Sequence, residues 1–202
     1  MPNFISEDQI ERALVQKLQH LHHFDVLECY TEDPEDLNDG SNRASKREII
    51  LVDRVREAAR RLNPTIPATA IEVALEKLLD KRLAMSLVAA NQEVYHLLRD
   101  GIPVEFDDAH GQKQHERVRL IDFNDAEQNR YLAVTQLWIK GERGFRRPDV
   151  LLYINGVPLV FIELKNSNVK LKTAFDDEAS VNEALRLVAR DVTASLIQLV
   201  TA

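Results

Sequence analysis

The first half of the chain carries apolar residues at helical spacing. Ser6-Glu7-Asp8-Gln9 has the pattern of a capping box, and the apolar positions after it recur every three or four residues. We therefore predict a first helix from about Ser6 to His22. The same spacing predicts helices at Arg47 to Leu62, Ala68 to Lys81 and Asn91 to Asp100. These three make a helical subregion, at about 47–100, inserted before a sheet.

From Ile102 onward the pattern becomes that of strands. Apolar runs between polar turns predict strands at Ile102 to Phe106, Arg117 to Phe123 and Tyr131 to Lys140, and the run from Phe24 to Tyr30 is a candidate short strand. Near the end of the chain, helical spacing predicts a closing helix over about 178–201, with apolar positions at Val181, Leu185, Val188, Val192, Leu196 and Leu199. Together these elements predict an α/β fold, a mixed β-sheet of four or five strands flanked by helices.

Two apolar runs around Asn155-Gly156 predict a β-hairpin, because Asn-Gly is the strongest short-range signal for a tight turn. Asp149 precedes the first run, and Glu163 and Lys165 end the second, so charged residues gather at the open end of the hairpin. With a strict two-residue turn, Asp149 would lie opposite Ile162, and the carboxylates of Asp149 and Glu163 would face opposite sides of the sheet. A site that uses both carboxylates therefore requires an odd loop or a bulge.

The composition is that of one domain. A chain of 202 residues with 45% hydrophobic content can bury one sizeable core. No apolar run approaches the length of a membrane span, so we expect a soluble, cytoplasmic chain. The single cysteine, Cys29, excludes an internal disulfide and gives no zinc-ligand spacing, and we expect it to be a buried or half-buried thiol.

The net charge of −7 argues against unspecific binding of polyanions by the whole surface. Any contact with nucleic acid must then be local. Basic residues do cluster on both sides of Asp149, and the candidates for DNA binding are Arg143, Arg146, Arg147, Lys170 and Lys172. A solvated, charged turn is the alternative interpretation of this cluster.

The order of these blocks resembles a known family. Pro148-Asp149, an apolar strand and Glu163-Leu164-Lys165 are similar to the PD-(D/E)xK nuclease motif. The wider context, from about Phe4 to Phe175, is similar to the N-terminal nuclease region of the restriction (R) subunit of type I restriction-modification enzymes. The blocks that carry this similarity are Asn38-Asp39, Asn42-Arg43, Arg47-Glu48, Arg117 to Phe123 and Arg147-Pro148-Asp149.

This resemblance implies a restriction-endonuclease-like core and Mg²⁺-dependent hydrolysis of DNA phosphodiesters. The implied metal ligands are Asp149, Glu163 and the main-chain carbonyl of Leu164, while Lys165 would orient the attacking water and offset developing charge. The related fold often supplies one more acidic residue from its first helix, for which Glu11 is the candidate; a solvated helix residue is the other interpretation. For Asp149, Glu163 and Lys165 the structural alternative is an ion-pair cluster on an edge strand.

The resemblance also implies partners: double-stranded DNA, and the methylation and specificity subunits of a restriction-modification complex, without a membrane. ATP would act only through a translocation motor, whose Gly-x-x-x-x-Gly-Lys-Ser/Thr loop does not occur in the sequence. The family's Gln-x-x-x-Tyr pair, counted from Ala174-Phe175, falls near Asp177 and Val181 and does not match. We expect a fragment, a truncated gene product or a stand-alone relative. Two hypotheses stay open: a Mg²⁺-dependent endonuclease domain, and a non-catalytic remnant that keeps the fold and serves in docking to DNA or subunits.

Overall fold

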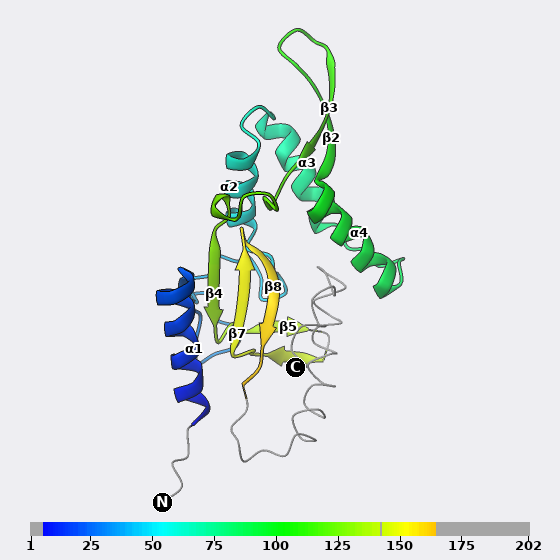
Figure 1. The fold of residues 1–202 in the computed structure, drawn as a ribbon. Coiled ribbons are helices and arrows are strands. Elements are labelled where there is room, and N and C mark those ends of the chain that lie inside the picture. Colours follow the sequence, from blue (N-terminus) through cyan, green and yellow to red (C-terminus); the bar gives the residue numbers. More distant parts are fainter. Residues whose placement is uncertain (1–5, 142, 165–202) are drawn as a thin grey trace, which may run out of the picture.

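A four-stranded mixed sheet is the centre of the computed structural model, which describes residues 6–141 and 143–164. The strand order is β1-β4-β7-β8, where β1 is Asp25–Glu28, β4 is Tyr131–Thr135, β7 is Val150–Ile154 and β8 is Val157–Ile162. β1 runs parallel to β4, whereas the β4–β7 and β7–β8 pairs are antiparallel (Figure 1). The predicted α/β class with a mixed sheet is confirmed, and the candidate strand near Phe24 is part of that sheet.

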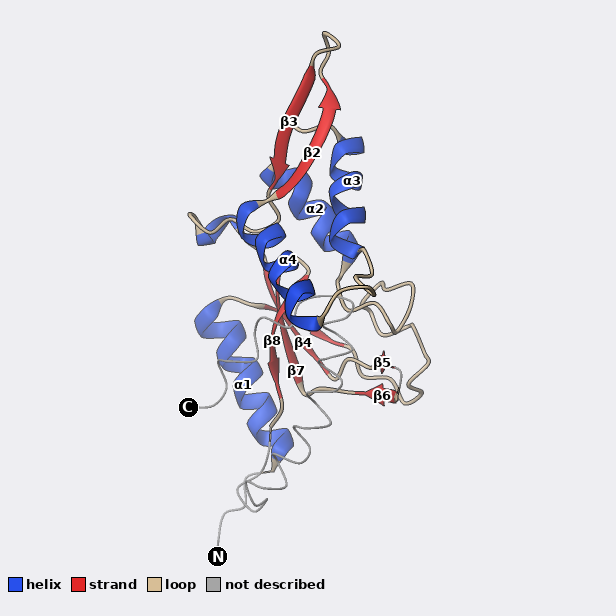
Figure 2. Cartoon of the chain, turned by 90° about the vertical axis from the view of Figure 1, so that its right-hand side faces the viewer, coloured by secondary structure: helices blue, strands red, loops and turns tan. Residues whose placement is uncertain are grey.

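One face of the sheet is covered by the first helix, α1 (Glu7–His22), as Figure 2 shows. The capping box predicted from the sequence is present, because Ser6 and Gln9 each bind the main chain of the other. Leu18 packs against Ala133 of β4 and Val150 of β7. The amphipathic pattern of the first helix thus arises from burial against this face.

The opposite face is covered by segments without regular structure together with Ile139, from a short strand described below. Ile49 and Leu51 are buried against Leu132, Val134, Leu151 and Tyr153 of the sheet. The hydroxyl of Tyr153 donates to the carbonyl of Ile49 at 3.1 Å. Cys29 is fully buried in the same cluster, which confirms the prediction of a buried thiol. Burial and the nearby carboxylate of Asp39 raise the pKa of this thiol to about 12, so it is an inert core residue.

The helical subregion consists of α2 (Val52–Leu62), α3 (Ala68–Leu79) and α4 (Leu87–Asp100). The predicted start of its first helix, at Arg47, is wrong. Residues 49–51 are all buried, and the main-chain N–H of Leu51 donates to Gly156 rather than to a helical partner. The subregion therefore starts at about residue 52 instead of 47, because contacts with the sheet keep residues 49–51 out of the helix.

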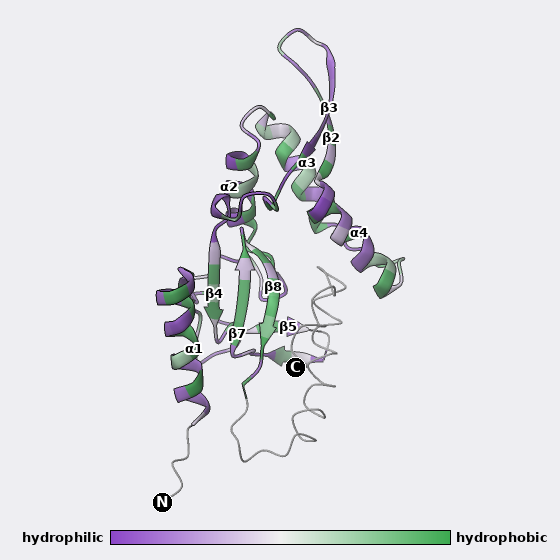
Figure 3. Ribbon diagram, in the orientation of Figure 1, coloured by the Kyte–Doolittle hydropathy of each residue, from purple (hydrophilic) through white to green (hydrophobic). Residues whose placement is uncertain are grey.

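The strands β2 (Ile102–Asp107) and β3 (Lys113–Val118) form a separate hairpin that projects from the molecule (Figure 1). The prediction that they belong to the main sheet is wrong, as is the predicted strand from Arg117 to Phe123. The main chain of Arg119 binds the side chain of Asn63 in both directions, which stops the ladder at Val118. Most of this hairpin is hydrophilic, whereas β7 and β8 are apolar over most of their length (Figure 3).

The predicted strand from Tyr131 to Lys140 is broken into two. Gln136 has a positive φ of 55°, and its main-chain N–H makes the last hydrogen bond between β4 and the β7 side, to the carbonyl of Asp149, before the strand ends. Beyond this break, β5 (Ile139–Gly141) and β6 (Gly144–Arg146) form a short hairpin on the side of the sheet away from α1 (Figure 2). A short 3-10 helix, Ala126–Gln128, precedes β4. The predicted closing helix at about 178–201 lies outside the described residues. Of the helices that are described, none is both long and apolar enough to cross a membrane.

Candidate active site

A β-bulge in the β7–β8 hairpin sets the relative positions of the two motif carboxylates. Asn155 and Gly156 form the tight turn, with φ values of 52° and 87°, as a type I′ turn requires. Tyr153 pairs with Pro158 but Leu152 pairs with Val160, so Leu159 is the extra residue. The last pair of the ladder is Val150 with Ile162. Asp149 and Glu163 directly flank that pair and therefore lie opposite each other, which is the register that a shared site requires.

The turn end of this hairpin is fixed by the buried amide of Asn155. Its Nδ2 donates to the carbonyl of Leu120 and to Oδ1 of Asn129, both at 2.8 Å. Its Oδ1 accepts the main-chain N–H of Arg130 at 2.8 Å. These hydrogen bonds fix the turn end of β7 and β8 to neighbouring segments. The charged residues lie at the other end of the two strands.

Asp149 is half-buried at that other end, just before β7. Its Oδ2 accepts the main-chain N–H of Leu164 at 2.5 Å, so the carboxylate reaches across to the segment that follows β8. Its main-chain carbonyl accepts the N–H of Gln136 at 3.1 Å. Glu163 is exposed. Leu164 is half-buried. Lys165 lies outside the described residues.

Glu11 extends from α1 toward the same end of the sheet. It is half-buried, and its Oε2 accepts a hydrogen bond from Nε2 of Gln136 at 2.6 Å. Burial raises the pKa of Glu11; the hydrogen bond from Gln136 opposes this effect, and the negative charges of Asp149, Asp8 and Glu28 add to it. The structure therefore brings Glu11 into the electrostatic field of Asp149, with its side chain half-buried rather than fully solvated.

The donor set at this end suits a hard cation. Carboxylate oxygens are the ligands that Mg²⁺ prefers, and Mg²⁺ usually binds through one or two carboxylates while keeping several waters. Within residues 6–141 and 143–164, no group of three or more His, Cys, Asp or Glu side chains is close enough to enclose a metal ion. A site built on Asp149 and Glu163 would thus be of the open, partly hydrated kind.

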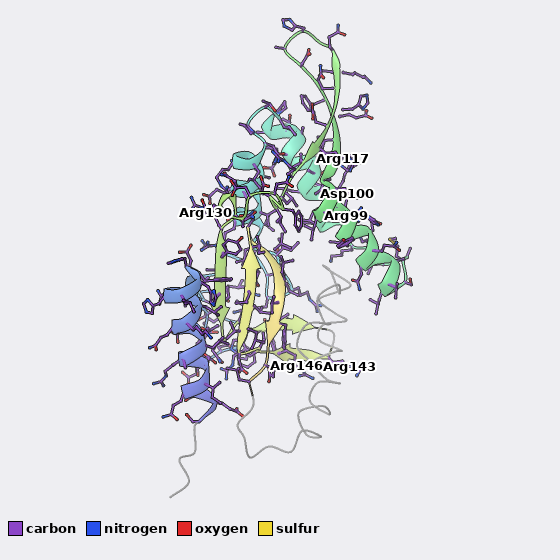
Figure 4. The ribbon with its side chains drawn as sticks, viewed as in Figure 1. Arg99, Asp100, Arg117, Arg130, Arg143 and Arg146 are labelled. Atoms are coloured by element: carbon purple, nitrogen blue, oxygen red, sulfur yellow. The ribbon has the colours of Figure 1, made fainter. Side chains whose placement is uncertain are left out.

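The basic residues near Asp149 divide into two groups. Arg143 and Arg146 are exposed on the β5–β6 hairpin, beside the open end of β7 and β8 (Figure 4). Arg147 is half-buried instead, because its guanidinium lies over the rings of Tyr30 and Trp138, at 5.1 and 4.8 Å from their centroids. Arg147 therefore holds the loop after β1 against the segment before β5. Lys170 and Lys172 lie outside the described residues.

A buried ion cluster supports the face of the sheet that carries the β5–β6 hairpin. Oδ2 of Asp39 lies 2.8 Å from both Nη2 of Arg43 and Nζ of Lys46, and all three side chains are at most 2% exposed. Arg43 also donates to the carbonyl of Trp138. Burial alone would raise the pKa of Asp39, but hydrogen bonds from Lys46, Ser41 and Arg43 outweigh it and hold this pKa well below its usual range. The cluster fixes the loop over 31–48 to the strand segment beside the candidate site.

Gln136 is the residue at this site that the pattern along the chain did not single out. The sequence pattern from Tyr131 to Lys140 predicts one continuous strand. Such a pattern does not indicate a turn at its centre. The available signal is the polar pair Thr135-Gln136 within a mostly apolar stretch. Trp138 and Tyr30, which enclose Arg147, are likewise residues from distant segments that no local pattern connects.

Comparison with known proteins gives a family. The model for the N terminus of type I restriction enzyme R proteins matches residues 4–190. The chain is 36% identical to the type I restriction enzyme HindI endonuclease subunit of Haemophilus influenzae over 80% of its length, and 31% identical to the putative type I restriction enzyme MjaIXP endonuclease subunit of Methanocaldococcus jannaschii over 86%. This chain, with its α/β fold and two carboxylates at the open end of a bulged hairpin, is thus similar in sequence to subunits of type I restriction enzymes. The chain belongs to the family of type I restriction enzyme R protein N-terminal regions, and it spans 15% and 16% of the length of these two relatives.

Proposed function

We propose that this chain is a Mg²⁺-dependent DNA endonuclease domain of a type I restriction-modification R subunit. The observation that carries the proposal is the register of β7 and β8: the bulge at Leu159 brings Asp149 opposite Glu163. A regular two-residue hairpin would have separated the carboxylates. Membership of the R protein family supports the same function, because its relatives are named as endonuclease subunits.

In this proposal, Asp149, Glu163 and the carbonyl of Leu164 hold the metal ion, with Glu11 as a further acidic group. The ion would supply polarisation of the scissile phosphate and activation of a water molecule. The hydrogen bond from the N–H of Leu164 to Asp149 keeps the segment after β8 close to the start of β7. Lys165, placed by sequence next to Leu164, would orient the attacking water and offset negative charge on the phosphate.

Double-stranded DNA is the proposed substrate, and Arg143 and Arg146 are the residues we expect to contact its phosphates. Both are exposed and lie beside the open end of the hairpin (Figure 4). Arg147 would act indirectly, because its guanidinium stacks on Tyr30 and Trp138. A net charge of −7 means that tight DNA binding needs help from other parts of an assembly, which we propose to be the motor, methylation and specificity subunits.

A second candidate function is docking without catalysis. Leu83, Met85 and Val88, before and at the start of α4, are 73%, 40% and 77% exposed, so three apolar side chains of one short segment face solvent. Such residues suit contact with another part of an assembly. The two functions differ in what they require of Asp149, since only the nuclease needs its carboxylate.

The test is calorimetric titration of the purified 202-residue chain with Mn²⁺, in wild type, Asp149→Ala and Asp107→Ala. Asp107 is an exposed carboxylate on the β2–β3 hairpin and serves as the matched control. The proposal expects Asp149→Ala to lose the binding that wild type and Asp107→Ala retain. Equal binding by all three proteins, or binding by none, would favour the docking function instead.

A further inference from the structure

Gln136 joins two acidic residues that come from distant parts of the chain. Its main-chain N–H donates to the carbonyl of Asp149 at 3.1 Å, and its side-chain Nε2 donates to Oε2 of Glu11 at 2.6 Å. The first contact fixes the main chain just before β7, and the second fixes a side chain of α1. A single residue thus sets how these two acidic residues approach each other.

The main-chain conformation of Gln136 is one that the intrinsic preference of glutamine does not favour, so contacts with the surrounding structure must stabilise it. Its φ of 55° lies in the left-handed region, which costs a residue other than glycine or asparagine roughly 1 kcal/mol. Such a cost is sustained where the surroundings require the geometry. Here the left-handed turn ends β4 and directs the amide of Gln136 toward α1.

The chemical type of the donor also matters. Glu11 and Asp149 repel each other, and that repulsion contributes to the raised pKa of Glu11. A lysine or arginine at position 136 would satisfy Glu11 by neutralising it, and would then compete with a metal ion. The neutral amide of Gln136 fixes one oxygen of Glu11 and leaves the negative charge in place.

Resting on the nuclease function proposed above, we infer that Gln136 is a positioning residue of the metal site, which acts by orienting Glu11 relative to Asp149. It touches neither substrate nor metal in this role. Groups that orient a ligand from behind typically change metal affinity by about 10 to 100-fold when removed. The effect of Gln136 should therefore appear in metal affinity rather than in folding.

The test uses Gln136→Gly, which removes the amide but keeps the left-handed conformation without strain, and Gln136→Asn, which tolerates that conformation but is one carbon too short to reach Glu11. Asn42→Gly is the matched control, since Asn42 is exposed and has a φ of 57°. Calorimetry with Mn²⁺ should show about tenfold weaker binding for both Gln136 variants and no change for Asn42→Gly. Melting temperatures should stay within a few degrees of wild type for all three.

A double-mutant cycle with Glu11→Gln separates positioning from general structural support. In the Glu11→Gln background, Gln136→Gly should weaken Mn²⁺ binding by less than about twofold, because the residue through which it acts has already been changed. Full additivity, or wild-type affinity in both Gln136 variants while Asp149→Ala loses binding, overturns this inference and leaves the proposed function standing. If wild type itself fails to bind Mn²⁺, the proposed function falls and the role of Gln136 falls with it.

Discussion

The main-chain carbonyl of Gly156 accepts a hydrogen bond from the N–H of Leu51 at 2.9 Å. This contact joins the turn of the β7–β8 hairpin to the residue that precedes α2. It places the helical subregion directly against the end of the hairpin that does not carry the carboxylates. The geometry of the candidate site therefore depends on how closely two main-chain segments approach at a glycine.

The first prediction follows from this close approach. A Cβ at Gly156 would lie 2.7 Å from the carbonyl oxygen of Leu51 and 2.9 Å from the N of Val55, with φ at 87°. Gly156→Ala should therefore combine the left-handed penalty with a main-chain clash and cost about 3 kcal/mol or more of unfolding free energy. Gly111→Ala, at a φ of 72° with nothing within 4 Å, should cost only about 1–2 kcal/mol. Urea unfolding of both variants measures the difference, and equal costs would contradict the predicted clash.

The second prediction concerns acid stability. The pKa of Asp39 is lowered in the folded chain, so this carboxylate stabilises the fold above its unfolded pKa, about 3.9, and its contribution falls as the pH drops through the folded value. Asp39→Asn should cost about 3–5 kcal/mol at neutral pH, because two buried cations lose their partner. It should also remove part of the acid dependence of unfolding.

The control for Asp39 is Asp53→Asn. Asp53 pairs with Arg56 on the surface, and its side chain is 72% exposed. An exposed pair of this kind contributes about 1 kcal/mol or less. Unfolding followed from neutral pH to about pH 3 should separate the two variants, and similar curves would mean that the buried cluster adds nothing.

The third prediction addresses catalysis in the complete assembly. Glu163→Gln should abolish DNA cleavage and shift the melting temperature by no more than a degree or two, because Glu163 is exposed and fills no part of the core. Lys165→Ala should likewise abolish cleavage. Glu105→Gln, on the β2–β3 hairpin with a side chain 67% exposed, is the control and should cleave normally. Retained cleavage in Glu163→Gln would remove this carboxylate from the mechanism.

The fourth prediction separates two adjacent arginines. Arg147→Ala should lower the unfolding free energy by about 1–2 kcal/mol, since it loses two ring contacts. Arg146→Ala should leave stability unchanged. It should lower the slope of the DNA-binding constant against salt concentration, on logarithmic scales, by the amount expected for about one lost phosphate contact. Binding isotherms at several salt concentrations, together with melting curves, test both expectations. A loss of stability in Arg146→Ala would instead show that Arg146 stabilises the folded structure.

The fifth prediction is that the chain alone will not cut DNA efficiently. Tight binding without sequence preference needs about six to ten phosphate contacts. The part of the chain that the structure describes offers fewer exposed basic residues than that beside the site. Supercoiled plasmid incubated with the chain and Mg²⁺ at low salt should stay largely intact. Rapid linearisation that depends on Asp149 would show a self-sufficient nuclease.

Local sequence determined the elements whose signals lie within a few residues. The capping box at Ser6 fixed the first helix, because both partners of its hydrogen bonds lie three residues apart. Asn155-Gly156 fixed the turn, because a type I′ turn needs two positive φ values. The charged residues at the open end of the hairpin were equally visible, since a carboxylate beside an apolar strand stands out in any pattern.

Only the tertiary structure decided how those residues meet. The bulge at Leu159 shifts the register by one residue, and the sequence permitted both the bulged and the regular hairpin. The segment from Arg47 to Leu51 has a helical pattern, but contacts with Gly156 and Tyr153 keep its last residues out of the helix. The strand β4 ends before Gln136, and the side chain of Gln136 donates to Glu11, 125 residues away. Contacts over such separations depend on the folded arrangement of the whole sheet, and no local propensity encodes them.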